Sequence, residues 1–167
     1  IAACALACVT AAMAFAGCGN TTAADNGNKV YNVGICQLVE HPALDAATQG
    51  FKDKLTELLG ADNVVFYEQN AQGESTNCST ICQGFVSNGY DLILANATPA
   101  LQAAAAATNS IPVLGTSVTD YGTALDIAEW TGTTGTNISG TADLAPIDDQ
   151  EKMLKELFPD VKQVGIL

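Results

Sequence analysis

The sequence predicts an α/β fold, a three-layer α/β/α sandwich built around a parallel sheet. Short apolar runs, typical of strands buried on both faces, alternate along residues 30–120 with longer segments of helical periodicity. The apolar run Leu92–Ala95, for example, is followed by the turn Asn96-Ala97 and then by the alanine-rich segment 98–109. Strands and helices that alternate at this spacing form parallel sheets with right-handed crossovers.

Four strands and three helices are expected along this part of the chain. The strands are predicted at 30–36, 63–70, 92–95 and 111–115, and the helices at 42–59, 75–88 and 98–109. Pro42 suits a first helical turn, and Gly60 and Gly89 are expected to end the first two helices. Ser75 and Thr98 are the expected caps of the second and third helices, because a hydroxyl group accepts a bond from the first free N–H groups.

The pattern becomes less regular after residue 125. Residues 132–140 are small and polar, which favours a crossover or a hinge. Pro146 is expected to begin an amphipathic helix that ends at Pro159, and residues 161–167 have the composition of a new strand. We therefore expect a first lobe over residues 29–143 and the truncated start of a second lobe over residues 144–167.

The first 18 residues have the composition of a secretory signal peptide. Residues 1–15 are apolar and small, carry no charge and lead into Ala16-Gly17-Cys18. Residues 15–18 resemble a bacterial lipobox, in which Cys18 would receive the lipid. A transmembrane anchor is the alternative, although residues 1–17 are barely long enough to span a bilayer. Residues 19–28 are small and polar, as expected of a flexible tether.

Composition and motifs argue against several classes of function. With 18 acidic and 6 basic residues and a formal net charge of −12, binding to nucleic acid or to an anionic membrane surface is disfavoured. His41 is the single histidine, and Cys78 with Cys82 are too few further ligands for zinc. We expect no metal, no cofactor and no catalytic residues, and hence no enzyme. Cys36, Cys78 and Cys82 are expected to be buried free thiols, although a disulfide of Cys36 with one of the others stays open.

Loops leave the carboxyl ends of the four expected strands and carry small, hydroxyl or amide side chains. They comprise residues 37–42, 70–73, 96–98 and 116–120. Ligands of open α/β sheets bind at this edge, and the free N–H groups that begin the 98–109 helix suit a carboxylate or another anion. This arrangement favours a module that captures a polar solute. An ordinary strand–helix connection without a ligand is the alternative for residues 92–109.

Several short motifs follow one another along residues 30–167. They include Glu40-His-Pro-Ala-Leu-Asp45, Asn70-Ala-Gln-Gly-Glu74, Ala97-Thr-Pro-Ala100, Val118-Thr-Asp120 and Asn137-Ile-Ser-Gly140. In this order and spacing they resemble the ABC-transporter substrate-binding proteins of the tryptophan/tyrosine type. The resemblance implies the first lobe of a two-lobed type I periplasmic-binding-protein fold, which closes on its ligand like a clamp. Most of the second lobe would lie outside this sequence.

The resemblance also implies which residues would hold the polar groups of an amino acid. Thr98, together with the backbone N–H groups of Ala97 and Thr98, would hold the α-carboxylate. Ser117, Thr119 and Asp120 would meet the ammonium group or line the wall of the site. For each of these residues, a role in capping a loop is the alternative.

Glu40, His41 and Asn70 would flank the ligand's side chain. The protein would then be an extracytoplasmic lipoprotein, anchored to the bacterial cell membrane through Cys18, that captures an aromatic or otherwise apolar amino acid for an ABC importer. Its partners would be the permease and ATPase subunits of that importer. The extracellular sensor domain of a signalling receptor, and a sugar- or nucleoside-binding protein of the same fold, stay as alternatives.

Overall fold

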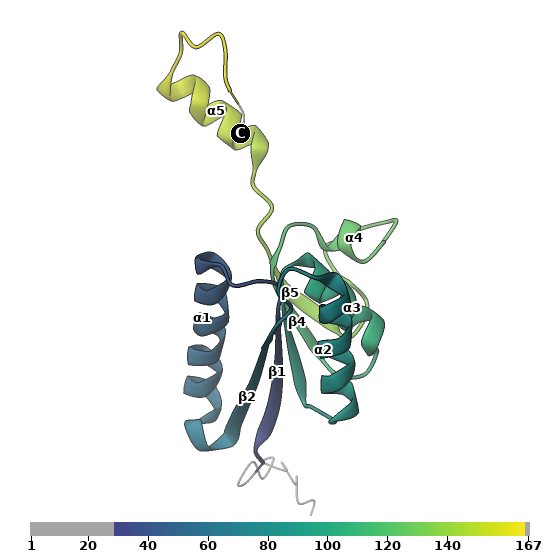
Figure 1. Ribbon diagram of the computed structural model, residues 1–167. Coiled ribbons are helices and arrows are strands. Elements are labelled where there is room, and N and C mark those ends of the chain that lie inside the picture. Colours follow the sequence, from purple (N-terminus) through teal and green to yellow (C-terminus); the bar gives the residue numbers. More distant parts are fainter. Residues whose placement is uncertain (1–28, 166–167) are drawn as a thin grey trace, which may run out of the picture.

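The computed structural model describes residues 29–165, and its centre is a parallel five-stranded sheet (Figure 1). The strands are β1 (Tyr31–Gln37), β2 (Val64–Asn70), β3 (Leu92–Asn96), β4 (Val113–Val118) and β5 (Ile138–Ala142), in the spatial order β2-β1-β3-β4-β5. The helices are α1 (Pro42–Leu59), α2 (Ser75–Ser87), α3 (Thr98–Ala107), α4 (Tyr121–Ala124) and α5 (Ile147–Leu157), with a 3-10 turn η1 (Ala61–Asn63). The predicted signal peptide, Cys18 and the tether lie outside the described residues.

Helices pack on both faces of the sheet, which confirms the predicted three-layer sandwich (Figure 1). On one face, Phe51 and Leu55 of α1 pack against apolar residues of β1, β2 and β3. On the other face, Phe85 of α2 and Leu101 of α3 belong to a larger apolar core. Burial of both faces explains why the central strands are continuous apolar runs.

Two helix starts differ from the sequence prediction by one residue. The N-cap positions of α2 and α3 are Glu74 and Ala97, and no side chain caps either helix. Ser75 and Thr98 are instead the first helical residues, so their predicted capping role is wrong. The predicted ends are confirmed for Gly60 and Gly89, whose φ angles of 86° and 65° favour glycine.

The prediction of a crossover or hinge over residues 132–140 is wrong at its end, because residues 138–140 belong to β5. Small and polar residues have a low preference for strands, so the composition of this segment does not predict β5. Gly140 is paired with Gly115 of β4, and an added Cβ on Gly140 would overlap the backbone of Gly115 and the hydroxyl of Tyr121.

The predicted strand after α5 is also absent from residues 161–165, which lie in no regular element.

The three cysteines of the described chain are buried free thiols, as predicted. They belong to the core between the sheet and α2, Cys36 from β1 and Cys78 and Cys82 from consecutive turns of α2. A hydrogen bond with Cys82 and, as the second-largest cause, burial raise the pKa of the Cys36 thiol. The same hydrogen bond lowers the pKa of Cys82. These side chains act as small apolar residues of the core.

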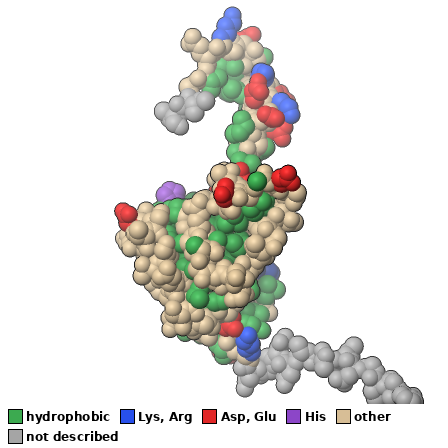
Figure 2. All heavy atoms as spheres, turned by 90° about the vertical axis from the view of Figure 1, so that its right-hand side faces the viewer, with side chains coloured by type: hydrophobic (Ala, Val, Ile, Leu, Met, Phe, Trp, Pro, Cys, Tyr) green, Lys and Arg blue, Asp and Glu red, His purple; other side chains and the backbone are tan. Residues whose placement is uncertain are grey.

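α5 projects beyond the carboxyl edge of the sheet (Figure 1). None of its residues is buried, and Ile147 and Leu157 keep 65% and 64% of their surface exposed. Figure 2 shows charged side chains gathered on this helix, where Lys152 pairs with Asp149 at 2.9 Å. Of the helices within residues 29–165, none is both long and apolar enough to cross a membrane.

Asp91, just before β3, ties the start of β1 to the sheet. Its carboxylate accepts a hydrogen bond from the N–H of Asn32 at 2.9 Å and lies 2.9 Å from the Nζ atom of Lys29. These contacts hold the pKa of Asp91 below its ordinary value, and the hydrogen bond from the backbone of Asn32 has the largest effect. A carboxyl group whose pKa is lower in the folded state stabilises that state above its unfolded pKa, and the contribution is lost as the pH falls through the lowered value.

We therefore expect Asp91→Asn to lower the free energy of unfolding at pH 7 and to weaken its dependence on pH below about pH 4. Urea unfolding at a series of pH values would measure both effects. Asp62→Asn is the matched control, because Asp62 is exposed and its side chain has no hydrogen-bond partner among residues 29–165. An Asp91→Asn variant with the pH dependence of the unmodified protein would contradict the prediction.

Candidate functional site

The carboxyl ends of four neighbouring strands form one row across the sheet. Gln37 of β1 pairs with Asn70 of β2 on one side and with Asn96 of β3 on the other. Asn96 pairs in turn with Thr116 of β4. The loops predicted to line a site therefore do leave the same edge of the sheet, side by side.

Backbone hydrogen bonds continue past the strand ends and join these loops. The N–H of Leu38 donates to the carbonyl of Asn96 at 3.2 Å, and the N–H of Gly73 donates to the carbonyl of Leu38 at 2.7 Å. The N–H of Ala97 donates to the carbonyl of Thr116 at 3.0 Å. Backbone hydrogen bonds therefore fix the positions of these loops relative to one another.

The start of α3 presents free donors at the middle of the edge. The N–H of Ala97 is bonded to the carbonyl of Thr116, and its contact with a carboxylate stays a prediction. The N–H groups of Thr98 and Ala100 have no partner among the described residues, and Pro99 between them has no N–H. Together with the positive end of the helix dipole, these two donors suit an anionic group.

Strained backbone also gathers at this edge. Ala97 has φ 92° and ψ 157°, a region that is favourable for glycine, and Gln72 and Ser117 have φ angles of 57° and 55°. Ser117 lies within an irregularity of β4 between Gly115 and Val118. Such conformations cost roughly 1–3 kcal/mol each and cluster at functional sites.

Two of the predicted site residues have structural roles in their loops. The Nδ1 atom of His41 accepts a hydrogen bond from the N–H of Ala43 at 3.2 Å and so caps α1. The Oδ1 atom of Asn70 accepts one from the N–H of Gln72 at 2.8 Å. Their alternative role in capping loops is therefore confirmed, and their contact with a ligand stays a prediction.

Asp120 caps α4 and keeps capacity for a further partner. Its Oδ1 atom accepts from the N–H groups of Gly122 and Thr123 at 2.9 and 3.3 Å, and its Oδ2 atom accepts from the hydroxyl of Thr123 at 2.8 Å. These bonds lower the pKa of Asp120 and keep it ionised, and the bonds from Thr123 have the largest effect. A carboxylate offers about four acceptor positions, so Asp120 retains one for a cation.

The remaining predicted residues have uncommitted side chains. No hydrogen bond within residues 29–165 involves the hydroxyls of Thr98, Ser117 and Thr119 or the carboxylate of Glu40. Thr98 and Ser117 are half-buried, whereas Glu40 and Thr119 are exposed. The edge thus offers hydroxyl groups and two carboxylates around the free donors of α3.

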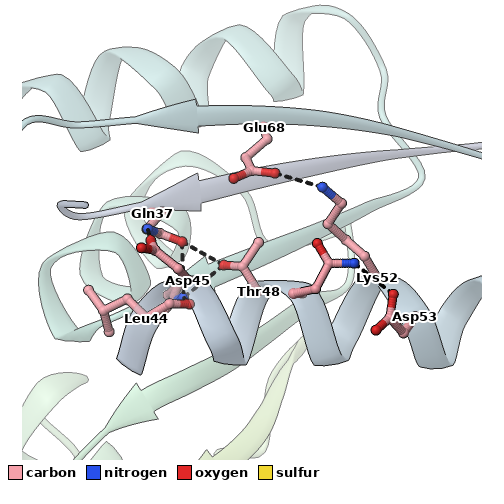
Figure 3. Close-up of polar contacts among 9 residues, drawn as sticks. Gln37, Leu44, Asp45, Thr48, Lys52, Asp53 and Glu68 are labelled. Carbon is pink, nitrogen blue, oxygen red and sulfur yellow. Dashed lines mark hydrogen bonds and ion pairs between the residues drawn. The ribbon is translucent and has the colours of Figure 1, made fainter. Parts of the chain in front are cut away.

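Two amide side chains that were expected on the exposed edge lie beneath it. Gln37 and Asn96 are 3% and 0% exposed, because they end strands rather than begin loops. Both contact Thr48 of α1, and Gln37 also donates to Asp45 at 2.6 Å (Figure 3). Sequence reasoning missed Thr48, although a hydroxyl on the apolar side of the 42–59 helix is a signal that could have found it.

Comparison with known protein families gives a match over most of the chain. Residues 32–167 match the family of the ABC transporter substrate binding protein. A tyrosine-binding protein of Clostridioides difficile (strain R20291) is 40% identical over 144 residues, which cover 85% of this chain and 41% of that relative. The chain thus spans about two fifths of the length of this curated relative.

Solved structures agree with this match, each with a TM-score of 0.71 and 80% of this chain covered. One is a conserved domain protein of Vibrio cholerae, 36% identical, of which 46% is covered. Another is the ligand-free, open form of a Clostridium difficile substrate-binding protein with adhesive properties, 41% identical, of which 45% is covered. A third is an ABC domain of Streptococcus pneumoniae in complex with L-Trp, 33% identical, of which 45% is covered.

Proposed function

This chain belongs to the family of ABC transporter substrate-binding proteins, and we propose that residues 29–143 are the first of two lobes that enclose an amino acid at the carboxyl edge of the sheet. The matched proteins are substrate-binding proteins, not enzymes. The observation that carries the proposal is the start of α3, where the N–H groups of Thr98 and Ala100 have no partner within residues 29–165. An α-carboxylate fits these donors and the helix dipole, and the ionised Asp120 suits an ammonium group.

An aromatic or otherwise apolar amino acid is the proposed ligand. Relatives that bind tyrosine and L-Trp support this class. In the proposed complex, the hydroxyl of Thr98 holds the carboxylate, and Ser117 and Thr119 line the wall. Glu40, His41 and Asn70 flank the ligand's side chain.

The second lobe would begin within residues 144–165. The exposed apolar residues of α5 support this, because an amphipathic helix is stable when another layer covers its apolar face. Closure of the second lobe would remove the ligand from water and strengthen its polar contacts. The first lobe alone would bind weakly.

The proposed setting is the outer side of the cell membrane. Substrate-binding proteins of ABC transporters are extracytoplasmic, and a lipobox at residues 15–18 would supply a lipid anchor at Cys18. The partners in this proposal are the permease and the ATPase of an importer, to which the closed protein delivers its amino acid. Mass spectrometry of the membrane fraction tests the anchor, since lipidation would leave a diacylglyceryl group on Cys18.

A ligand screen of the protein with both lobes tests the proposed function. Thermal unfolding would be followed with each of the twenty amino acids and with common sugars and nucleosides, and hits would be confirmed by calorimetry. A ligand at a hundred times its dissociation constant adds about 2.7 kcal/mol to the free energy of unfolding, or several degrees in Tm. Stabilisation by a sugar or nucleoside alone would leave the fold intact and exclude the amino acid. Silence across the screen would favour a sensor of another solute.

Thr98→Val is expected to raise the dissociation constant for the amino acid by about tenfold, because valine keeps the shape of threonine and removes the hydroxyl hydrogen bond. Calorimetric titration would measure it. Thr98→Ser is the matched control, since serine retains the hydroxyl and should bind within about twofold of the unmodified protein. Equal affinities for the Val and Ser variants would show that this hydroxyl does not contact the ligand.

A further inference from the structure

A buried polar network joins α1 to the ends of β1 and β3 (Figure 3). The hydroxyl of Thr48 donates to the Oε1 atom of Gln37 at 2.7 Å and accepts from the Nδ2 atom of Asn96 at 2.9 Å. The same Nδ2 atom donates to the carbonyl of Leu44 at 2.8 Å. Thr48 and Gln37 are each 3% exposed and Asn96 is fully buried. These bonds therefore form away from water, where they are stronger and more directional.

The network lies at one end of α1, directly below the candidate site. Toward its other end, α1 contacts the sheet through Phe51, Leu55 and Leu59, which are apolar. Apolar packing has little directionality and tolerates small shifts of a helix along a sheet. The first turns of α1 are instead tied to the strand ends by hydrogen bonds: those of Thr48, the bond from Asn96 to the carbonyl of Leu44, and the bond from Gln37 to Asp45 at 2.6 Å.

The network also reaches two loops of the site. The Nε2 atom of Gln37 donates to the carbonyl of Val39 at 3.0 Å, next to Glu40 and the helix cap His41. Asn96 is followed directly by the turn that carries Thr98. The hydroxyl of Thr48 thus bonds to both of the residues that end these two neighbouring strands, which also contact each other at 3.4 Å.

Asn96 has little else to hold it. Its Oδ1 atom is the buried side-chain atom without a hydrogen-bond partner within residues 29–165. The side chain is therefore oriented only by its Nδ2 group, whose acceptors are Thr48, the carbonyl of Leu44 and, at 3.4 Å, Gln37. Loss of the Thr48 hydroxyl would leave the longest of these three bonds and the one to the backbone.

We infer that Thr48 is a positioning residue for the ligand site, whose hydroxyl fixes the loop that carries Glu40 and His41 relative to the turn that carries Thr98. The inference rests on the function proposed above for this edge. Thr48 does not contact the ligand; it acts through Gln37 and Asn96. A displacement of either loop would change the distance between the groups that contact the two ends of an amino acid. Binding is sensitive to such a change in geometry.

Calorimetric titration with L-tyrosine and L-tryptophan, using the protein with both lobes, tests this role. Thr48→Val keeps the volume of the side chain and is expected to raise the dissociation constant by about tenfold, whereas Thr48→Ser should restore it to within about twofold. Leu55→Ala is the matched control, because it destabilises the same helix away from the network and should leave affinity within about twofold. Equal affinity for Thr48→Val and the unmodified protein, or an equal loss in Leu55→Ala, would overturn the inference.

Amide hydrogen exchange without ligand gives a second readout. In Thr48→Val, or in Thr48→Ala if the valine variant does not fold, exchange should accelerate in residues 38–48 and stay unchanged in residues 51–59. Uniform acceleration along α1, or none, would overturn the inference. If the unmodified protein binds neither amino acid, the proposed ligand fails, while the exchange data still decide whether Thr48 positions the two loops.

Discussion

Gly34→Ala is expected to lower the free energy of unfolding by about 3 kcal/mol. Gly34 lies in the middle of β1, where an added Cβ would stand 2.5, 2.6 and 2.9 Å from three atoms of the Phe85 ring. Phe85 is 1% exposed and stacks on Tyr90 with 5.3 Å between ring centroids. The ring cannot retreat without displacing the core between the sheet and α2, so the added methyl group forces a shift of packed atoms.

Chemical unfolding of three further variants makes this prediction specific. Gly84→Ala in α2 adds the same group where nothing lies within 4 Å, and it should raise the free energy of unfolding by roughly 0.5–1 kcal/mol. Phe85→Leu removes part of the ring. If contact with the ring is the cause, Gly34→Ala should cost less in the Phe85→Leu background than alone. An equal cost in both backgrounds would assign the loss to the backbone of β1 instead.

The layered architecture could be predicted from the sequence because its strands are buried on both faces. Such strands carry unbroken apolar runs, as at 92–95, and the intervening helices keep one apolar side. The stops at Gly60 and Gly89 were equally readable, since a positive φ favours glycine. The exact starts of the helices at Ser75 and Thr98 were harder to predict, because a hydroxyl side chain fits both the N-cap and the first helical position.

β5 could not be predicted because tertiary contact, and not composition, makes it a strand. Its Gly140 pairs with Gly115 of β4, beside the buried side chain of Tyr121, where a Cβ would not fit. A local pattern that is small and polar describes a hinge equally well. The two glycines are 25 residues apart in sequence (140 − 115), so their proximity is invisible until the sheet is assembled.

The location of the candidate site could be predicted from the topology of the sheet. Which of its hydrogen-bonding groups remain unpaired could not. Parallel strands place their following loops at one edge, and that much depends only on the order of elements. Which donors remain free depends on register: the N–H of Ala97 is taken because Asn96 pairs with Thr116. Likewise, Gln37 and Asn96 are buried because the strands extend one residue further than their apolar runs.

Asp120→Asn is expected to weaken binding of the amino acid by about a hundredfold and to change the free energy of unfolding by less than about 0.5 kcal/mol. Asparagine caps helices as well as aspartate does, so the Oδ1 atom can still accept from Gly122 and Thr123. The variant removes the negative charge that would pair with the ammonium group of the ligand. Its amide nitrogen takes the place of Oδ2 and can donate to the hydroxyl of Thr123, from which Oδ2 accepts.

Two further variants separate charge from capping. Asp126→Asn removes a neighbouring exposed charge and should bind normally, because asparagine tolerates the positive φ of 55° at this position. Asp120→Ala should lose both binding and stability, since alanine neither pairs nor caps. Calorimetric titration and urea unfolding of all three would show which property matters. If Asp120→Asn binds like the unmodified protein, the carboxylate serves only to cap α4, and the ammonium group must be met by Glu40 or by the opposite lobe.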